Sequence, residues 1–250
     1  MKRISILVLS ILLLQVYSQT YAQAKKTIPT AKPVLVKKTI PLKKTVASKP
    51  VLVAKDNLIR IKLTTDSGVM IMKLYDSTPL HRDNFVKLVK EGFFDSLLFH
   101  RVISHFMIQG GDPNSKYADS TSMLGNGGGD LARIPAEFKP SLYHKKGVLA
   151  AARDGNPEKA SSACQFYIVE GMVYTDEQLN MIEQQKGIKY SLQQRTNYKT
   201  VGGTPQLDQE YTVFGEVEKG IDVIKKISNV KKNNFDRPFG NIRMKMELLK

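Results

Sequence analysis

The sequence predicts a mainly β domain over residues 57–250. Several runs of four to eight residues alternate apolar and polar side chains, as strands with one buried face do. Gly, Asn, Asp and Ser gather between these runs, and these residue types favour turns. Helical periodicity is confined to a few short segments.

The first 24 residues have the pattern of a secretory signal. Lys2 and Arg3 form a positive start, and residues 4–16 form an apolar stretch shorter than the roughly 20 residues that span a bilayer. An A-x-A site at residues 22–24 predicts cleavage after Ala24. The alternative is an uncleaved anchor helix. We therefore expect an exported protein, in the periplasm or outside the cell.

Residues 25–56 form a second segment of unusual composition. The sequences KKTIP and KPVLV each occur twice, and nine lysines accompany a single acid, Asp56. Lys and Pro at this density cannot build a core, so we expect a disordered or polyproline-like tether. No aromatic-interleaved basic patch accompanies the charge, so nucleic acid is not an expected partner. A weak contact with an anionic envelope surface and a role as a solubilising spacer are both open.

The predicted domain begins with a hairpin and a helix. Residues 58–63 and 69–75 alternate apolar and polar side chains on either side of a turn. Thr78 and Pro79 then predict the start of a helix, with Thr78 as its cap, and Gly92 predicts its end.

Residues 97–112, LLFHRVISHFMIQGGD, predict two further strands that meet at residues 104–105. In a strand, side chains return to the same face every second residue. Arg101, Met107 and Gln109 therefore share a face, unless a bulge at the bend resets the register. Such a face suits an uncharged, partly apolar ligand. The alternative is a solvated arginine beside a plain apolar core.

Toward the C-terminus the pattern predicts more strands and one more helix. The glycine-rich residues 125–130, GNGGGD, lack the Lys-Ser/Thr of a phosphate-binding loop, and we expect them to pack beside the site. The only cysteine, Cys164, excludes an internal disulfide and is expected to be a buried small hydrophobe. The expected strands are 147–152, 164–169, 211–217 and 242–249, and the expected helix is 220–227.

Residues 171–203 predict a helical insertion between two of these strands. A capping-box pattern occurs twice, at residues 175–178 and 191–194, and Gly187 predicts the end of the first helix. A role in substrate selection and a merely decorative insertion are both open.

The sequence FHRVISHFMIQGGD closely resembles the signature of the cyclophilin-type peptidyl-prolyl cis-trans isomerases. In that family the arginine, the Phe-Met pair and the glutamine line the proline site. The resemblance therefore implies that Arg101 is the catalytic residue and that Phe106, Met107 and Gln109 bind the substrate.

Two further segments carry the resemblance. In CQFYIV, Gln165 and Tyr167 match site positions, and Tyr167 would form the pocket floor where Phe is usual. A buried Tyr167 hydroxyl needs a partner. In QLDQEYTVFG, Leu207 and Tyr211 match pocket positions, and Tyr211 stands where many members have His. Arg153 aligns with a residue whose main chain pairs with the substrate.

The resemblance covers residues 57–250 except the insertion at 171–203, and it implies a closed eight-stranded antiparallel barrel capped by two helices. The site would lie on the outer face, because side chains fill the interior of a small barrel. The implied function is X-Pro isomerisation in exported or envelope proteins, with proline-containing polypeptides as partners. Rotation breaks no bond, so no cofactor and no metal are expected. No long apolar face calls for a second copy, so we expect a monomer.

Two other functions are open at the level of the sequence. One is a non-catalytic module that binds proline-containing peptides, as a chaperone would, and the intact site residues argue against it. The other is a metal-dependent or nucleophilic hydrolase. The four histidines are scattered and lack the spacing of paired metal ligands, which argues against a hydrolase.

Overall fold

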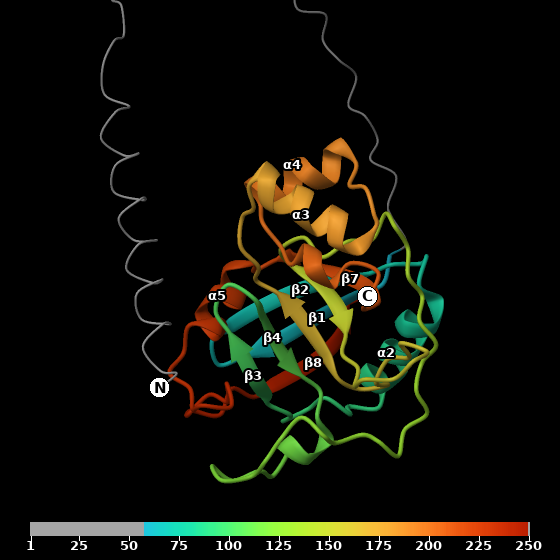
Figure 1. Ribbon diagram of the computed structural model, residues 1–250. Helices are drawn as coiled ribbons and strands as arrows, with labels where there is room; N and C mark the ends of the chain where they lie inside the picture. The colour runs from blue at the N-terminus through green and yellow to red at the C-terminus, as the bar shows by residue number, and fades with distance from the viewer. Residues whose placement is uncertain (1–57, 250) are drawn as a thin grey trace, which may run out of the picture. The chain divides into compact units, whose positions relative to one another are not determined.

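Antiparallel strand pairing dominates residues 58–249, which are the residues that the computed structural model describes. Within them, eight strands form one sheet in the order β3-β4-β6-β5-β7-β2-β1-β8 (Figure 1). The mainly β prediction is confirmed, whereas the predicted signal and tether, residues 1–56, lie outside the described residues. The strands are β1 (Arg60–Thr65), β2 (Gly68–Leu74), β3 (Phe99–Ile103), β4 (Met107–Gly110), β5 (Val148–Ala151), β6 (Phe166–Val169), β7 (Val213–Lys219) and β8 (Met244–Leu249).

The sheet is curled but open, so the prediction of a closed barrel is wrong. β3 and β8 are its end strands, and no ladder joins them within residues 58–249. At the start of β3, Phe99 N–H still donates to the carbonyl of Ile242, just before β8, at 3.0 Å. Further along, Val102 N–H donates to the carbonyl of Asp236 at 2.9 Å, and the Val102 carbonyl accepts from Lys232 Nζ at 2.8 Å. The loop before β8 therefore covers the edge of β3 that closure would have paired.

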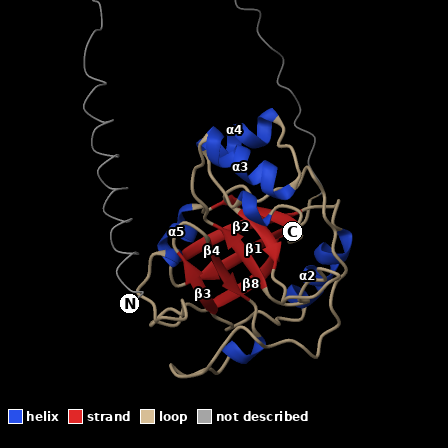
Figure 2. Ribbon diagram, in the orientation of Figure 1, coloured by secondary structure: helices blue, strands red, loops and turns tan. Residues whose placement is uncertain are grey.

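Four α-helices of the described residues lie around the strands (Figure 2). In Figure 1, α5 lies to the left and α2 to the right of the curled strands, and both contribute to the same main core, through Val223 and Phe85 for example. No described helix is long and apolar enough to cross a bilayer. The helices are α2 (Pro79–Lys90), α3 (Asp176–Lys186), α4 (Leu192–Thr200) and α5 (Asp222–Ser228), with 3₁₀ turns η1 (Pro113–Ser115) and η2 (Pro205–Leu207).

The start of α2 is capped by a distant residue. Thr78 occupies the N-cap position, as expected, but its side chain accepts no hydrogen bond from the helix. The carboxylate of Glu137 accepts instead from the N–H groups of Leu80 and His81, at 3.2 and 3.0 Å. A carboxylate at this end also complements the helix dipole. Local sequence carries no sign of this contact.

Helices α3 and α4 form the predicted insertion and lie together beyond one end of the strands (Figure 1). Both capping boxes are present, at Thr175 and Ser191, and Gly187 ends α3 with a left-handed φ of 66°. The insertion has a small core of its own. Its buried members are Leu179, Tyr190 and Tyr198.

Candidate active site

A second apolar cluster lies on the outer face of the sheet. Along β6, Phe166 and Ile168 belong to the main core, whereas Tyr167 and Val169 belong to the second cluster. This division follows from the alternation of side chains in a strand. The buried members of the second cluster are Met107, Val148, Ala150, Ala152, Tyr167, Val169 and Val213.

A cavity of about 140 Å³ opens on this cluster. All but one of its lining residues are site residues that the sequence predicted, and Ala152 is the addition. Gln165 lies outside this cavity and lines a neighbouring one beside the glycine-rich loop. The lining residues are Arg101, Phe106, Met107, Gln109, Ala152, Arg153, Tyr167, Leu207 and Tyr211.

Arg101 reaches the cavity because the pairing of β3 with β4 sets it opposite Gln109. Its side chain is 44 % exposed. Its Nη1 donates to Gln109 Oε1 at 3.4 Å, and its Nε lies 3.9 Å from Asp236 Oδ2. Both contacts are long, so the five N–H donors of the guanidinium are largely available to a ligand. The predicted common face of Arg101, Met107 and Gln109 is confirmed, since all three line the cavity.

A chain of amides holds Gln109 in place. Its Nε2 donates to Gln165 Oε1 at 3.2 Å. Gln165 Nε2 in turn donates to the carbonyls of Gly125 and Gly127, at 2.9 and 3.0 Å. The Gln109 oxygen is thereby left to face Arg101. Gln165 thus acts from behind the cavity, and the glycine-rich loop packs beside the site as expected.

The hydroxyl of Tyr167 has a buried partner below the cavity floor. Tyr167 is 5 % exposed, and its hydroxyl lies 2.9 Å from Nε2 of His144. His144 Nδ1 lies 2.8 Å from Asp208 Oδ1, and Tyr198 of α4 donates to Asp208 Oδ2 at 2.5 Å. Because a carboxylate can only accept, His144 Nδ1 donates to Asp208, and in the neutral imidazole Nε2 then accepts a hydrogen bond from the Tyr167 hydroxyl. Burial raises the pKa of Tyr167 well above its usual value, so the hydroxyl keeps its proton.

Sequence reasoning missed His144 and Asp208 as parts of the site. His144 was one of four scattered histidines, and Asp208 was only the neighbour of Leu207. The one available signal was the need of a buried Tyr167 hydroxyl for a partner.

Arg153 forms one wall of the cavity with its side chain. Its Cζ lies 4.7 Å from the ring centre of Tyr211, a cation–π distance, and its Nε donates to the carbonyl of Glu210 at 2.9 Å. The prediction for Arg153 concerned its main chain. The guanidinium is a second positive group at the cavity.

The described residues offer little for nucleophilic or metal chemistry. Within residues 58–249, no group of three or more His, Cys, Asp or Glu is arranged to hold a metal ion. Burial raises the pKa of Cys164, which keeps it a thiol and a poor nucleophile. The site can bind an apolar ring and donate hydrogen bonds beside it.

Comparisons with known proteins agree with this geometry. A family model described as cyclophilin type peptidyl-prolyl cis-trans isomerase/CLD matches residues 60–247. A Staphylococcus epidermidis protein that bears the name "Putative peptidyl-prolyl cis-trans isomerase" is 35 % identical over 185 residues, 74 % of this chain and 88 % of that protein. A Staphylococcus haemolyticus protein of the same name is 33 % identical over 189 residues, 75 % of this chain and 89 % of that protein.

A crystal structure is similar in fold. It is that of a cyclophilin type peptidyl-prolyl cis-trans isomerase from Cryptosporidium parvum, with a TM-score of 0.58 and 23 % identity. The match covers 77 % of this chain and 98 % of that one. A second structure of the same protein, in the presence of the dipeptide Ala-Pro, matches with a TM-score of 0.57 and 22 % identity, over 76 % of this chain and 99 % of that one.

Removing the Tyr167 hydroxyl tests the buried chain below the cavity. We expect Tyr167→Phe to lower the free energy of unfolding by about 1–3 kcal/mol, because His144 Nε2 loses its donor in a buried place. Urea denaturation measures this. Tyr117→Phe is the matched control, because Tyr117 is 89 % exposed. Equal losses in the two variants would contradict the assigned contact.

The buried His100, next to Arg101 on β3, predicts a pH dependence of stability. Burial lowers its pKa to about 4, whereas an unfolded histidine titrates near 6.5. Between these values the unfolded chain binds the extra proton, so stability falls as pH drops from about 6.5 to about 4. The full contribution is roughly 3 kcal/mol. Urea denaturation at pH 7 and pH 4 measures the fall in the free energy of unfolding, which should be smaller for His100→Gln than for wild type. An equal fall in the two proteins would refute this assignment.

Proposed function

This chain belongs to the cyclophilin-type peptidyl-prolyl cis-trans isomerases, and we propose that it rotates X-Pro bonds in the cavity beside Arg101. The observation that carries the proposal is the convergence of the predicted residues. They come from β3, β4, β6 and three connecting segments, and all of them except Gln165 line one cavity with an exposed guanidinium at its edge.

Rotation about an X-Pro bond breaks no covalent bond. Resonance makes the peptide C–N bond partly double and sets a rotation barrier of roughly 18–20 kcal/mol. Unaided X-Pro rotation therefore takes tens to hundreds of seconds. An enzyme accelerates it by binding the twisted amide more tightly than either planar form. Because rotation breaks no covalent bond, no nucleophile or metal is required.

Arg101 is the proposed catalytic residue. Twisting localises a lone pair on the prolyl nitrogen, and a guanidinium that donates to this nitrogen stabilises the twisted state. Phe106, Met107, Tyr167, Leu207 and Tyr211 hold the ring. Further contributions come from Gln109, which orients Arg101 or binds a substrate carbonyl, from Gln165, which orients Gln109, and from the main chain of Arg153.

The proposed setting is outside the cytoplasm. The support is the sequence of residues 1–56, with its charged start, its short apolar stretch and its A-x-A site. The clients are then exported or envelope proteins, the domain of residues 57–250 acts as a monomer, and the Lys-rich residues 25–56 tether it. The net charge of these residues supports a weak contact with anionic envelope surfaces.

Arg101→Ala tests the catalytic assignment. Loss of a charge-assisted hydrogen bond of about 1.5–3 kcal/mol should lower kcat/KM about 10- to 150-fold. A coupled cis/trans assay on an Ala-Pro peptide measures this. The kcat/KM of Arg101→Lys should lie between those of wild type and Arg101→Ala, because lysine keeps the charge but lacks the planar set of N–H donors.

Arg82→Ala is the control, since Arg82 pairs with Asp76 and Asp83 on the surface of α2. Unchanged turnover by a folded Arg101→Ala variant would remove Arg101 from the mechanism. If the wild-type protein binds the peptide but does not shorten the relaxation time of its cis/trans exchange, the domain is a non-catalytic binding module.

Expression in a bacterium with an intact export system tests the proposed setting. The mature chain is expected to leave the cytoplasm and to begin at Lys25, because cleavage follows Ala24. N-terminal sequencing and light scattering measure the start and the mass of the purified protein. A cytoplasmic chain that retains Met1 would contradict export, and a stable dimer would contradict the monomer.

A further inference from the structure

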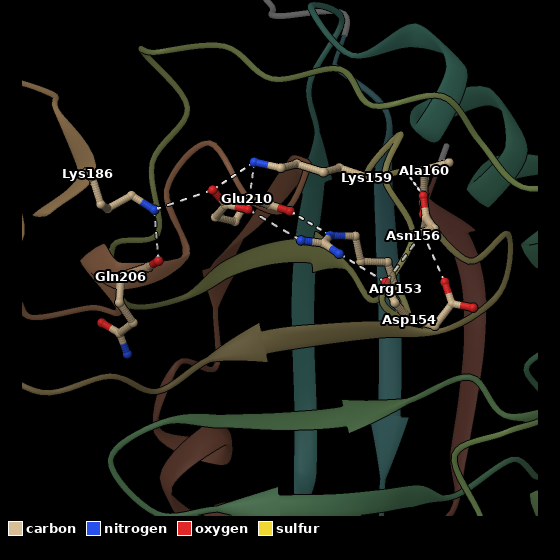
Figure 3. A network of polar contacts seen from close by, with 8 residues as sticks. All are labelled: Arg153, Asp154, Asn156, Lys159, Ala160, Lys186, Gln206 and Glu210. Atoms are coloured by element: carbon tan, nitrogen blue, oxygen red, sulfur yellow. Dashed lines mark hydrogen bonds and ion pairs between the residues drawn. The ribbon is translucent and has the colours of Figure 1, made fainter.

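Three cations from separate segments converge on one carboxylate, that of Glu210, at the edge of the cavity beside Arg101 (Figure 3). Lys159 Nζ donates to the carboxylate of Glu210 at 2.8 Å. Arg153 Nη2 lies 3.4 Å and Lys186 Nζ 3.9 Å from the same carboxylate. We call Arg153, Lys159 and Lys186 the cationic rim. Figure 3 shows Lys186 approaching Glu210 from one side and the other two cations from the opposite side.

The insertion contributes to this rim. Lys186 lies in the last turn of α3, and its Nζ donates to the carbonyl of Gln206 at 3.0 Å. Gln206 directly precedes Leu207, which lines the cavity. The insertion therefore delivers a positive charge to the edge of the site.

The charges of the rim are incompletely balanced. Glu210 is one carboxylate for three cations, and the hydrogen bond from Lys159 lowers its pKa, so it stays ionised. Asp208, which is bonded to His144 and Tyr198, adds a second negative charge near Lys186, so two carboxylates still face three cations. Burial lowers the pKa of Lys186, the charge of Lys159 lowers it further, and the two carboxylates offset only part of this. An additional anion at the rim would stabilise these cations.

We infer that the cationic rim selects client segments that carry Asp or Glu close to the proline. The inference rests on the proposed function, because it places a client in the cavity. Arg153 lines the cavity itself, and Lys159 and Lys186 extend its positive charge outward along Glu210. A carboxylate side chain beside the bound proline meets N–H donors there, whereas a lysine meets like charges. Substrate selection is then the role of the insertion.

The selection also bears on the chain's own prolines. Residues 37–44, KKTIPLKK, contain an Ile-Pro bond flanked by lysines on both sides. A cationic rim disfavours such a segment as a substrate. A peptide of this sequence is therefore expected to be a poor substrate and serves as a negative control.

A peptide series with a common Ala-Pro core tests the inference. Each peptide carries Glu, Gln or Lys at one of three positions on either side of the proline, and the coupled assay gives kcat/KM for each. We expect kcat/KM of the Glu peptide to exceed that of the Gln peptide by about three- to tenfold at one or two positions. This is the range expected for two exposed ion pairs. Lys and the KKTIPLKK peptide should fall below Gln. The preference should lie in KM and shrink at high salt.

The double variant Lys159→Gln/Lys186→Gln assigns the preference to the rim. It should bring the Glu/Gln ratio close to one, whereas the exposed Lys90→Gln on α2 should leave the ratio as in wild type. A ratio that survives the double variant would overturn the inference. Should the double variant fail to fold, the wild-type series and its salt dependence still decide.

The Gln peptides report the isomerase reaction itself. Equal turnover of the Glu, Gln and Lys peptides at every position would overturn the charge selection and leave the proposed function intact. Failure of wild type to accelerate any peptide would instead overturn the proposed function.

Discussion

The register between β3 and β4 is the constraint on which the proposed site depends. It sets Arg101 directly opposite Gln109 and leaves both, with Met107, on the outer face of the sheet. A slip of one residue would turn each of these side chains to the other face. The outer face would then lose Arg101 and Gln109 together. The same pairing carries Ile108 into the main core, so the packing that stabilises the fold also fixes the site.

Polar groups behind the apolar cavity keep its walls in place. Gln165 ties Gln109 to the glycine-rich loop, and His144 with Asp208 holds the hydroxyl of Tyr167. Gln165, His144 and Asp208 do not line the cavity, and both connections join segments that are distant along the chain. Buried polar groups are costly unless they are paired, so a paired set favours one arrangement of the cavity. The insertion takes part through Tyr198, which bonds to Asp208.

The sequence was informative wherever structure depends on neighbours along the chain. Strand alternation predicted the shared face of Arg101, Met107 and Gln109, and the capping boxes at Thr175 and Ser191 predicted both helices of the insertion. The resemblance to the family's motifs predicted which residues line the cavity. These residues are distant along the chain, and strand or helix periodicity alone could not have grouped them.

Contacts between distant segments were not predictable in the same way. The cap that Glu137 provides to α2 and the bond between His144 and Tyr167 join residues tens of positions apart. The open seam between β3 and β8 has the same origin. A loop residue, Asp236, takes the hydrogen bond at Val102 that a neighbouring strand would have taken.

A crystal structure of this chain with a bound Ala-Pro peptide would show whether Arg101 acts on the prolyl nitrogen. We expect the pyrrolidine ring to lie among Met107, Tyr167 and Leu207, with a guanidinium nitrogen of Arg101 about 3 Å from the prolyl nitrogen. A ring bound elsewhere, or an Arg101 turned away onto Asp236 while the ring occupies the cavity, would contradict this expectation.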